Sequence, residues 1–352
     1  MSRADRLAEA LEVDALLVTN LVNVHYLTGF TGSNGMAVVG PDLRRFITDF
    51  RYTEQAASEV EGFDVELAPQ DFNAALADGW PEGSVRLGFE DDQVSVRRHT
   101  RLRELLPDGV ELVPAGGAVE ALRAVKDAGE IARIRAAAEL ADAVYAMLRT
   151  EGLVGRTERE VALALENEMR RLGAEAPSFD SIVASAERGA LPHAQPADVP
   201  IVRGTLVTLD IGARLDGYCS DCTRTWATGD LPDDLAEAYA LVLRAQEASL
   251  AAVRPGPEGR EIDAVARDII EAAGHGEHFG HGLGHGVGME VHEAPRLART
   301  GDEPLVAGNI VTVEPGVYLP GRGGVRIEDL VVVTEAGHDV LSGTTKELVV
   351  VD

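Results

Sequence analysis

The sequence predicts a two-domain α+β protein, in which an α/β domain of residues 1–124 precedes a second domain of residues 125–352. A chain of 352 residues suits about two domains, at roughly 150 residues each. In the first third of the chain, strand-like and helix-like patterns alternate, which is typical of an α/β domain. The second part contains an internal repeat, which favours a domain built from two related halves.

Short apolar runs predict the strands of the first domain, and segments with helical periodicity lie between them. Strands are expected at residues 14–19, 35–39, 44–48, 65–67, 85–89 and 110–113. Helices are expected at residues 52–60 and 96–106. A longer helix at residues 128–148 opens the second domain, because its apolar side chains recur every three or four positions.

The repeat in the second domain relates two segments 104 residues apart. Residues 204–212 read GTLVTLDIG and residues 308–316 read GNIVTVEPG, so Asp210 falls opposite Glu314. The same offset places the helical pattern around Val161 over the pattern around Val265. A duplicated helix-plus-strand unit is therefore the better interpretation, with chance similarity between strand sequences as the alternative.

Each repeated strand leads into a hairpin whose return strand carries a second acid. After Asp210, an Asp-Gly turn precedes a return strand with Asp221; after Glu314, a glycine-rich turn precedes one with Glu328. Acids rarely lie among Val, Ile and Leu unless they are paired or bind a metal, although a solvated strand face is the alternative. The return strands are expected at residues 218–226 and 325–333.

Residues 279–293, FGHGLGHGVGMEVHE, combine histidines with a high density of glycine. Glycine at this density excludes a stable helix, and with it a helical zinc motif with two histidines four residues apart. It suits a loop or strand whose backbone closely approaches another group. A flexible loop with incidental histidines is the alternative.

Four acids and at least one imidazole in a single pocket would require cations. Two carboxylates about 4 Å apart repel by ~4 kcal/mol at an effective dielectric of about 20, so four would mostly protonate. Two divalent cations balance four negative charges and together activate water and polarise a carbonyl. The oxygen-rich donor set suits Mn²⁺ or Co²⁺ and also admits Zn²⁺. The residues thus predict metal-assisted hydrolysis of an amide or ester.

Composition excludes several other classes of function. The net charge of −27 disfavours binding to nucleic acid or to anionic membrane surfaces, and no apolar run is long enough to span a bilayer. The N-terminal residues do not read as a signal peptide, and two cysteines suit a reducing, cytoplasmic setting. Cys219 and Cys222 have redox-motif spacing, but they lie on an expected strand rather than at a helix start, which disfavours a redox role.

At these acids and histidines the sequence resembles the pita-bread metallopeptidases, the group that includes prolidase, aminopeptidase P and methionine aminopeptidase. The resemblance implies a pita-bread catalytic domain with an internal pseudo-two-fold repeat. It also implies that two divalent metal ions are held by five ligands: Asp210, Asp221, His285, Glu314 and Glu328.

The resemblance further implies roles for residues around the metals. Glu314 would also act as the proton shuttle, while His193 and His292 would contact the substrate and the developing oxyanion. His281 would support the pocket, and Arg296 matches an arginine that prolidases use near the proline carboxylate. Arg296 as a surface arginine is the alternative.

Two further positions, Tyr318 and Arg326, would orient ligands and the reaction intermediate. The alternatives are a packing role for Tyr318 and a counter-charge role for Arg326.

Residues 18–35, VTNLVNVHYLTGFTGSNG, and residues 47–56, ITDFRYTEQA, resemble the first domain of prolidase and aminopeptidase P. Methionine aminopeptidase lacks this domain, and creatinase lacks the metal ligands. The resemblance therefore implies hydrolysis of the Xaa-Pro bond in a proline-containing peptide, with a dipeptidase favoured over an aminopeptidase and a non-catalytic binding protein as a remote alternative. It also implies a homodimer in which the N-terminal domain serves dimerisation and closure of the cleft.

Overall fold

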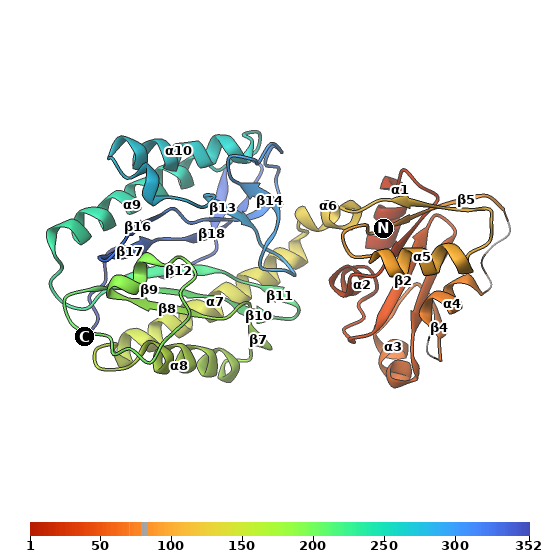
Figure 1. Cartoon of the computed structure of the whole chain (residues 1–352), viewed down its shortest axis with the longest axis horizontal. Helices are drawn as coiled ribbons and strands as arrows, with labels where there is room; N and C mark the ends of the chain where they lie inside the picture. Colours follow the sequence, from red (N-terminus) through yellow and green to blue (C-terminus); the bar gives the residue numbers. More distant parts are fainter. Residues whose placement is uncertain (70, 79, 81–82) are drawn as a thin grey trace. The chain divides into compact units, whose positions relative to one another are not determined.

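The computed structural model describes residues 1–69, 71–78, 80 and 83–352, and the chain divides into two units, Met1–Arg123 and Ala124–Asp352. Each unit has its own hydrophobic core. Both units combine helices with sheets (Figure 1), which confirms the predicted α+β class. Among the described residues, no helix is both long and apolar enough to cross a membrane.

The N-terminal unit contains a six-stranded mixed sheet with the strand order β4-β3-β2-β1-β5-β6. The central strand β1 is buried at all four positions and pairs antiparallel with β2 and parallel with β5. All six expected strands are present. They are β1 (Ala15–Val18), β2 (Gly35–Gly40), β3 (Leu43–Thr48), β4 (Asp64–Leu67), β5 (Val85–Phe89) and β6 (Val110–Pro114).

Helices of the N-terminal unit connect and cover these strands. The expected helix 52–60 corresponds to the 3-10 turn η1 (Phe50–Tyr52) with α3 (Thr53–Glu59), and the expected helix 96–106 corresponds to α5 (Val96–Leu105). Four more helices were not expected: α1 (Arg3–Ala10), α2 (Leu21–Thr28), α4 (Phe72–Ala77) and α6 (Ala118–Ala124).

Helix α2 shows why the local sequence pattern did not predict these helices. Its sequence, LVNVHYLT, is rich in β-branched and aromatic residues, which have low helix propensity. Its first turn is instead stabilised by Asn20, whose side chain accepts from the amide of Val22, and by the buried Glu90, which accepts from the amides of Thr19 and Asn20. Glu90 lies about seventy positions along the chain, so its contribution is invisible to a short window.

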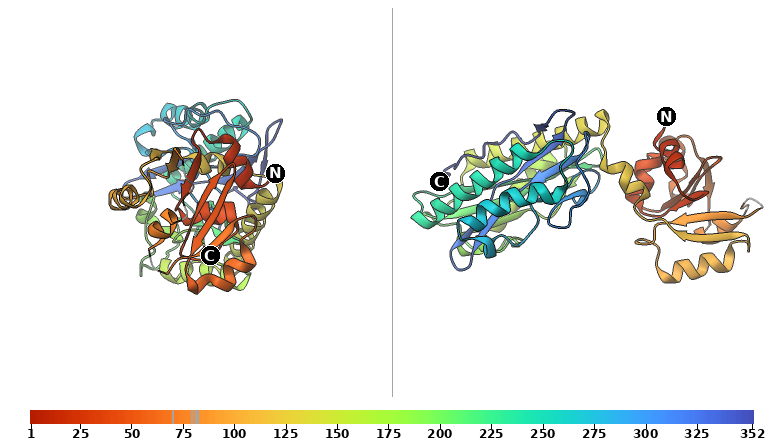
Figure 2. Two further views of the ribbon diagram at one scale, coloured as in Figure 1. Left: turned by 90° about the vertical axis from the view of Figure 1, so that its right-hand side faces the viewer. Right: turned by 90° about the horizontal axis from the view of Figure 1, so that it is seen from above.

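In the C-terminal unit, two helix pairs lie on opposite sides of the strands (Figure 1). Helices α7 (Ala128–Glu151) and α8 (Glu158–Arg171) share one core with β8, β9 and β12, and α9 (Asp233–Ala252) and α10 (Gly259–Ala272) share another with β15 to β18. The right-hand view of Figure 2 shows α9 and α10 side by side over their strands. The expected helix 128–148 is α7, which starts at a capping box formed by Asp127 and Glu130.

The strands of the C-terminal unit fall into two sets, one in each half. The first set comprises β7 (Ala176–Pro177), β8 (Ile182–Ser185), β9 (Leu206–Ile211), β10 (Ala213–Leu215), β11 (Tyr218–Cys219) and β12 (Cys222–Ala227). The second comprises β13 (Gly284–Gly286), β14 (Glu293–Leu297), β15 (Ile310–Val313), β16 (Gly316–Leu319), β17 (Gly323–Arg326), β18 (Asp329–Val333) and β19 (His338–Val340). Two 3-10 turns accompany them, η2 (Ala186–Ala190) and η3 (Gly276–His278).

The repeat is confirmed for the strands, but the helices follow a different offset. Strands β9 and β15 correspond at 104 residues, as expected. The buried positions of α8 match those of α10 at an offset of 101, so the expected pairing of Val161 with Val265 is wrong, and Val161 corresponds to Ile262. The two halves therefore differ by three residues in length between helix and strand. The matching buried sets are Glu158, Val161, Ala162, Leu165 and Met169 in α8, and Gly259, Ile262, Asp263, Ala266 and Ile270 in α10.

The two expected return strands are each interrupted, and the interruptions carry the acids. The chain breaks between β11 and β12 at Ser220 and Asp221, and between β17 and β18 at Ile327 and Glu328. At each break the chain leaves a hairpin, β10–β11 or β16–β17, and joins a second strand pair, β9–β12 or β15–β18. A continuous strand would alternate its side chains strictly; the break frees each acid from that alternation.

The glycines of the 279–293 segment lie in a strand and loop, as expected, and Gly284 shows the close approach that the sequence implies. A Cβ at Gly284 would lie 2.1 Å from the carbonyl oxygen of Thr312 in the neighbouring strand, whereas a Cβ at Gly280 would meet nothing within 4 Å. Only a residue without a side chain allows β13 and β15 to pair this closely.

We predict that Gly284→Ala lowers the free energy of unfolding of the C-terminal unit by about 1–3 kcal/mol, because the added methyl group pushes β13 away from β15. Gly280→Ala is the matched control and should change it by no more than about 0.5 kcal/mol. Urea unfolding followed by circular dichroism measures both. Equal midpoints for the two variants would contradict the close approach at Gly284.

Candidate metal centre

Equivalent places in the two halves supply the acids of the centre. Asp210 lies at the end of β9, opposite Thr223 of β12, and Asp221 directly precedes β12. In the other half, Glu314 directly follows β15 and Glu328 directly precedes β18. The halves join next to these acids, where the amide of Glu328 donates to the carbonyl of Thr223 at 3.2 Å.

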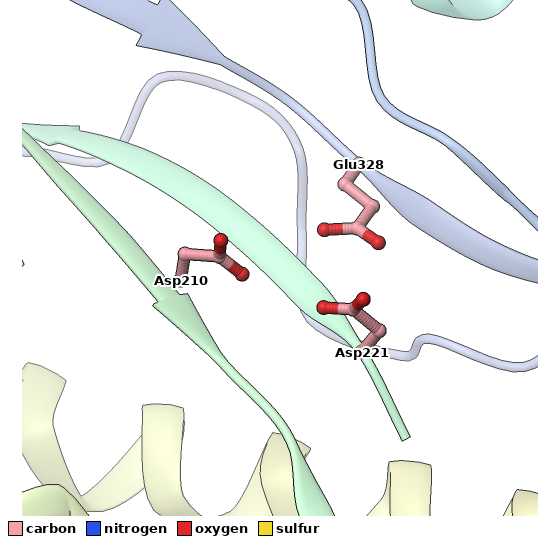
Figure 3. Close-up of side chains that lie close together, drawn as sticks. All are labelled: Asp210, Asp221 and Glu328. Carbon is pink, nitrogen blue, oxygen red and sulfur yellow. The ribbon is translucent and has the colours of Figure 1, made fainter. Parts of the chain in front are cut away.

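Three of the acids form a compact buried cluster. Carboxylate oxygens of Asp210, Asp221 and Glu328 lie within 4.8 Å of one another, and the residues are only 9%, 6% and 1% exposed. Figure 3 shows the three side chains pointing toward one another, Asp210 from β9 and Asp221 and Glu328 from the segments that precede β12 and β18. Burial and the charges of the neighbouring carboxylates raise the pKa of Asp221 and of Glu328 well above the ordinary values.

Two oxygens of this cluster have no protein partner. Oδ1 of Asp210 and Oε1 of Glu328 are buried and accept no hydrogen bond from the described residues. A buried carboxylate oxygen without a donor is costly, and coordination to a cation removes that cost. The unpartnered oxygens therefore fit a metal ion at the centre of the cluster.

His285 and Glu314 extend the cluster on one side. Nε2 of His285 lies 3.2 Å from Oε1 of Glu314 and 3.6 Å from Oδ2 of Asp221. The other ring nitrogen, Nδ1, lies 3.0 Å from the carbonyl oxygen of Gly286 and donates to it, so Nε2 is the ring nitrogen that faces the carboxylates. A histidine held this way is prepared for metal ligation through Nε2.

The pKa shifts of His285 and Glu314 also indicate that positive charge is favoured beside these carboxylates. Burial opposes a charge on His285, but the hydrogen bond and the charge of Glu314 outweigh it and raise the pKa of His285 to about 9. Burial alone would raise the pKa of Glu314, but the bond from His285 and its charge lower that pKa to about 2. Without a metal, a proton on His285 takes the place of a cation between the carboxylates.

The five residues assigned as ligands from the sequence are thus brought together. Four carboxylates and one imidazole nitrogen form a continuous set, with Asp221 contacting both sides of it. Two divalent cations would balance the four negative charges, and this donor set accommodates Mn²⁺, Co²⁺ or Zn²⁺.

A buried arginine orders the residues beside Asp210. Arg326 donates to Oδ2 of Asp210 at 2.7 Å, to the hydroxyl of Thr223 at 3.0 Å and to the hydroxyl of Tyr318 at 3.0 Å. The Tyr318 hydroxyl lies 2.8 Å from Nε2 of His281, whose Nδ1 lies 2.7 Å from the carbonyl oxygen of Gly282. The hydroxyl of Tyr318 and both ring nitrogens of His281 are engaged in these hydrogen bonds, which argues against a purely packing role for Tyr318.

The remaining residues expected at the site, His292, His193 and Arg296, lie at or near the surface. The ring of His292 lies against that of His285, with the centroids 4.2 Å apart and the planes tilted by 53°, and burial and the charge of His285 lower the pKa of His292. His193 is exposed. Arg296 is exposed and lies directly opposite His285 in the β13–β14 pair, so the two side chains share a face of that ribbon.

Two residues with supporting contacts were missed from the sequence. The hydroxyl of Thr312 donates to Oε1 of Glu314 at 2.9 Å and accepts from the amide of His285 at 3.1 Å. Thr312 is one of the residues shared by the two repeats, a signal that could have identified it. Arg224 donates to the main-chain carbonyl of Glu328 and to Oδ1 of Asp329 at 2.9 Å, but no local pattern marks it.

Cys219 and Cys222 are free thiols within the fold. Both are buried, and burial raises the pKa of Cys219 to about 11 and that of Cys222 well above its ordinary value. A buried thiol with a raised pKa is a poor nucleophile, in agreement with the expectation that this pair has no redox role.

Comparison with known proteins identifies relatives of both units. The family model described as metallopeptidase family M24 matches residues 132–335, and the model described as the creatinase/prolidase N-terminal domain matches residues 1–125. The Xaa-Pro dipeptidase of Pyrococcus horikoshii is 37% identical over 343 residues, which cover 96% of this chain and 95% of that protein.

Two solved structures resemble the whole chain. The Xaa-Pro dipeptidase from Bacillus anthracis is 41% identical, with a TM-score of 0.95 and 99% coverage of both chains. The X-Pro aminopeptidase from Thermotoga maritima is 36% identical, with a TM-score of 0.90 and coverage of 98% of this chain and all of that one.

We predict that Asp221→Asn lowers the affinity for Mn²⁺ by more than ~10-fold, because the neutral amide replaces the carboxylate that contacts both sides of the centre. Asp216→Asn is the matched control, since it removes the same charge from an exposed turn of the same hairpin. Calorimetric titration and metal content after gel filtration measure both variants. Unchanged occupancy in Asp221→Asn would exclude Asp221 as a shared ligand.

Proposed function

The chain belongs to metallopeptidase family M24 and has a creatinase/prolidase N-terminal domain, and from this membership we propose that it hydrolyses the peptide bond before proline, as an Xaa-Pro dipeptidase. The observation that carries the proposal is the set of four carboxylates with His285, in which Asp210, Asp221 and Glu328 are buried. The names of relatives that match nearly the full length of the chain support the Xaa-Pro bond as the target.

The centre would combine metal and protein chemistry. Two divalent cations, when bound by Asp210, Asp221, His285, Glu314 and Glu328, would polarise the scissile carbonyl and lower the pKa of a water molecule. Oε1 of Glu314 is engaged by Thr312 and His285, whereas Oε2 lies 4.0 Å from Nε of Arg326, beyond hydrogen-bond length. We therefore assign Oε2 as the oxygen that carries a proton from the attacking water to the leaving nitrogen.

Neighbouring side chains would position the substrate. The lowered pKa of His292 keeps its imidazole neutral at neutral pH, so that the ring can donate a hydrogen bond to the developing oxyanion. His193 would contact the substrate from the other half of the unit. The chain of hydrogen bonds from Arg326 through Tyr318 to His281 would hold Asp210 and the pocket wall in place.

The choice of a dipeptidase depends on Arg296. A dipeptide ending in proline presents a carboxylate next to the scissile bond, and a guanidinium pairs well with a carboxylate. Arg296 shares a face with His285 and is exposed, so it is free to make such a pair. An Xaa-Pro aminopeptidase that accepts longer peptides is the second candidate, and the similarity to the Thermotoga maritima enzyme favours it.

Three finer features belong to the same proposal: Mn²⁺ or Co²⁺ as the native metal, a homodimer, and a cytoplasmic location. The mixed oxygen and nitrogen donors support the metals. The family resemblance supports the dimer. The two free cysteines support a reducing compartment.

The proposed function is tested with Ala-Pro and Ala-Ala as paired dipeptide substrates. Protein loaded with Mn²⁺ should release alanine from Ala-Pro much faster than from Ala-Ala, and exhaustive treatment with EDTA should abolish the activity until Mn²⁺ is returned. The amino acids released are measured by chromatography. Activity that survives metal removal, or equal rates on the two dipeptides, would refute the proposal.

We predict that Arg296→Met reduces kcat/KM for Ala-Pro by about 10-fold or more, because a charge-assisted pair is worth roughly 1.5–3 kcal/mol. The same variant should hardly change hydrolysis of Ala-Pro-Ala, whose proline has no free carboxylate. Arg299→Met, at another exposed arginine nearby, is the control. Equal losses on both peptides would favour the aminopeptidase.

A further inference from the structure

One buried acid outside the metal centre holds the segment that carries His193. Glu158 is the first residue of α8 and is fully buried. Its Oε1 accepts from the amide and the hydroxyl of Ser185 at 2.8 and 2.9 Å, and its Oε2 accepts from the amide of Ala197 at 3.1 Å. Ser185 and Ala197 are the two ends of the segment that contains His193, so a single carboxylate ties both ends together.

An arginine inside the segment completes this clamp. Nε of Arg188 donates to Oε2 of Glu158 at 2.8 Å, and the same guanidinium donates to the carbonyl of Gln195 at 2.6 Å. Glu158 therefore accepts four hydrogen bonds, two at each oxygen, all from this segment. The position of Glu158 at a helix N-terminus further stabilises its negative charge.

The opposite half of the unit contacts the same segment. Arg326 donates to the carbonyl of Pro192, the residue before His193, at 3.3 Å. The backbones at Gly189 and Gly324 are in close contact, because a Cβ at Gly324 would lie 2.0 Å from the carbonyl oxygen of Gly189. The segment is thus held by Glu158 from one half and by β17 from the other.

The backbone of the segment is not in a relaxed conformation. Ala186, directly after Ser185, has a φ of 49°, in the left-handed region that residues with a side chain seldom adopt. Such conformations persist only where surrounding contacts enforce them, and they concentrate at functional sites. The bonds of Glu158 to the neighbouring Ser185 supply that enforcement.

His193 itself depends on this backbone for its position. Among the residues that the structure describes, none forms a hydrogen bond or ion pair with the His193 side chain. A side chain that contacts substrate but is not anchored by its own bonds is placed by its main chain alone.

We propose that Glu158 is a positioning residue for peptide hydrolysis, which acts by clamping the 185–197 segment and thereby setting the position of His193. The proposal rests on the substrate role that the proposed function assigns to His193. The carboxylate of Glu158 bonds to Ser185, Arg188 and Ala197 and to none of the five proposed metal ligands. Replacing Glu158 should therefore leave the metal sites filled.

The test variant is Glu158→Gln, which preserves shape but places an NH₂ group where one oxygen accepts. Glutamine has only one accepting oxygen, so it can accept either from Ser185 or from Ala197 and Arg188, but not from both groups. One end of the segment should therefore open. Glu168→Gln is the matched control: it lies on the same helix and loses only a surface pair with Arg171. Hydrogen–deuterium exchange should speed up across residues 185–197 in Glu158→Gln and not in Glu168→Gln, and unchanged exchange would overturn the clamp.

A double-mutant cycle with His193→Ala then tests the link to the reaction. Glu158→Gln should reduce kcat/KM for Ala-Pro by ~10- to 100-fold, the cost of misplacing a group by about 1 Å, with metal content unchanged. In the His193→Ala background the same change should cost no more than about twofold. Equal losses in both backgrounds would show a general structural effect and would overturn the positioning role.

Two further outcomes are distinguishable. If His193→Ala alone costs nothing, the positioning role fails together with the role of His193, while metal-dependent hydrolysis of Ala-Pro by the unaltered protein still stands. If Glu158→Gln does not fold, Arg188→Met replaces it in both measurements, because Arg188 is partly exposed and its loss leaves the Ser185 and Ala197 bonds intact. Smaller changes in the same directions are then expected, and their absence would overturn the proposal.

Discussion

Mutual repulsion among buried carboxylates is the constraint on which the C-terminal unit depends. Asp210, Asp221 and Glu328 lie too close together and too far from water to remain charged without positive partners. The fold supplies Arg326 to Asp210 and His285 to Glu314, and both pairs lie at the edge of the cluster. Oδ1 of Asp210 and Oε1 of Glu328 still lack a partner among the described residues, which leaves the remaining compensation to bound cations.

The duplicated architecture explains how such an unfavourable cluster can be assembled. Each half provides one acid where a strand ends and one where a return strand is interrupted, and the halves join beside them through Thr223, Thr225 and Arg326. Close to the contact between the two halves, another buried acid is paired with basic side chains. Asp329, next to Glu328, accepts from both Arg224 and Lys346, so the residue that follows Glu328 is itself held by two cations.

Much of this arrangement could be predicted from the sequence because its signals are local or repeated. The strand repeat placed Asp210 opposite Glu314, and the glycine density around His285 indicated close backbone contact. The interruption of the return strands could not be predicted, because it results from pairing with two different partners, β11 with β10 and β12 with β9. Glu158 and Arg224 were missed for a related reason: their partners lie about 30 to 120 positions away, and nothing in their neighbouring residues marks them.

The histidine-bearing segments of the two halves are held by similar means but not by equivalent residues. In the second half, Asp263 on α10 accepts from the amide of Leu283 at 2.9 Å, and Arg267 donates to the carbonyls of Phe279 and His281 at 3.0 and 2.9 Å. At the helix offset of 101, Asp263 corresponds to Ala162 and not to Glu158. A shared ancestral side chain therefore does not account for both clamps. What the halves have in common is the arrangement: a buried carboxylate and its paired arginine together accept from main-chain amides and donate to main-chain carbonyls, and so fix the backbone of a segment that carries histidines.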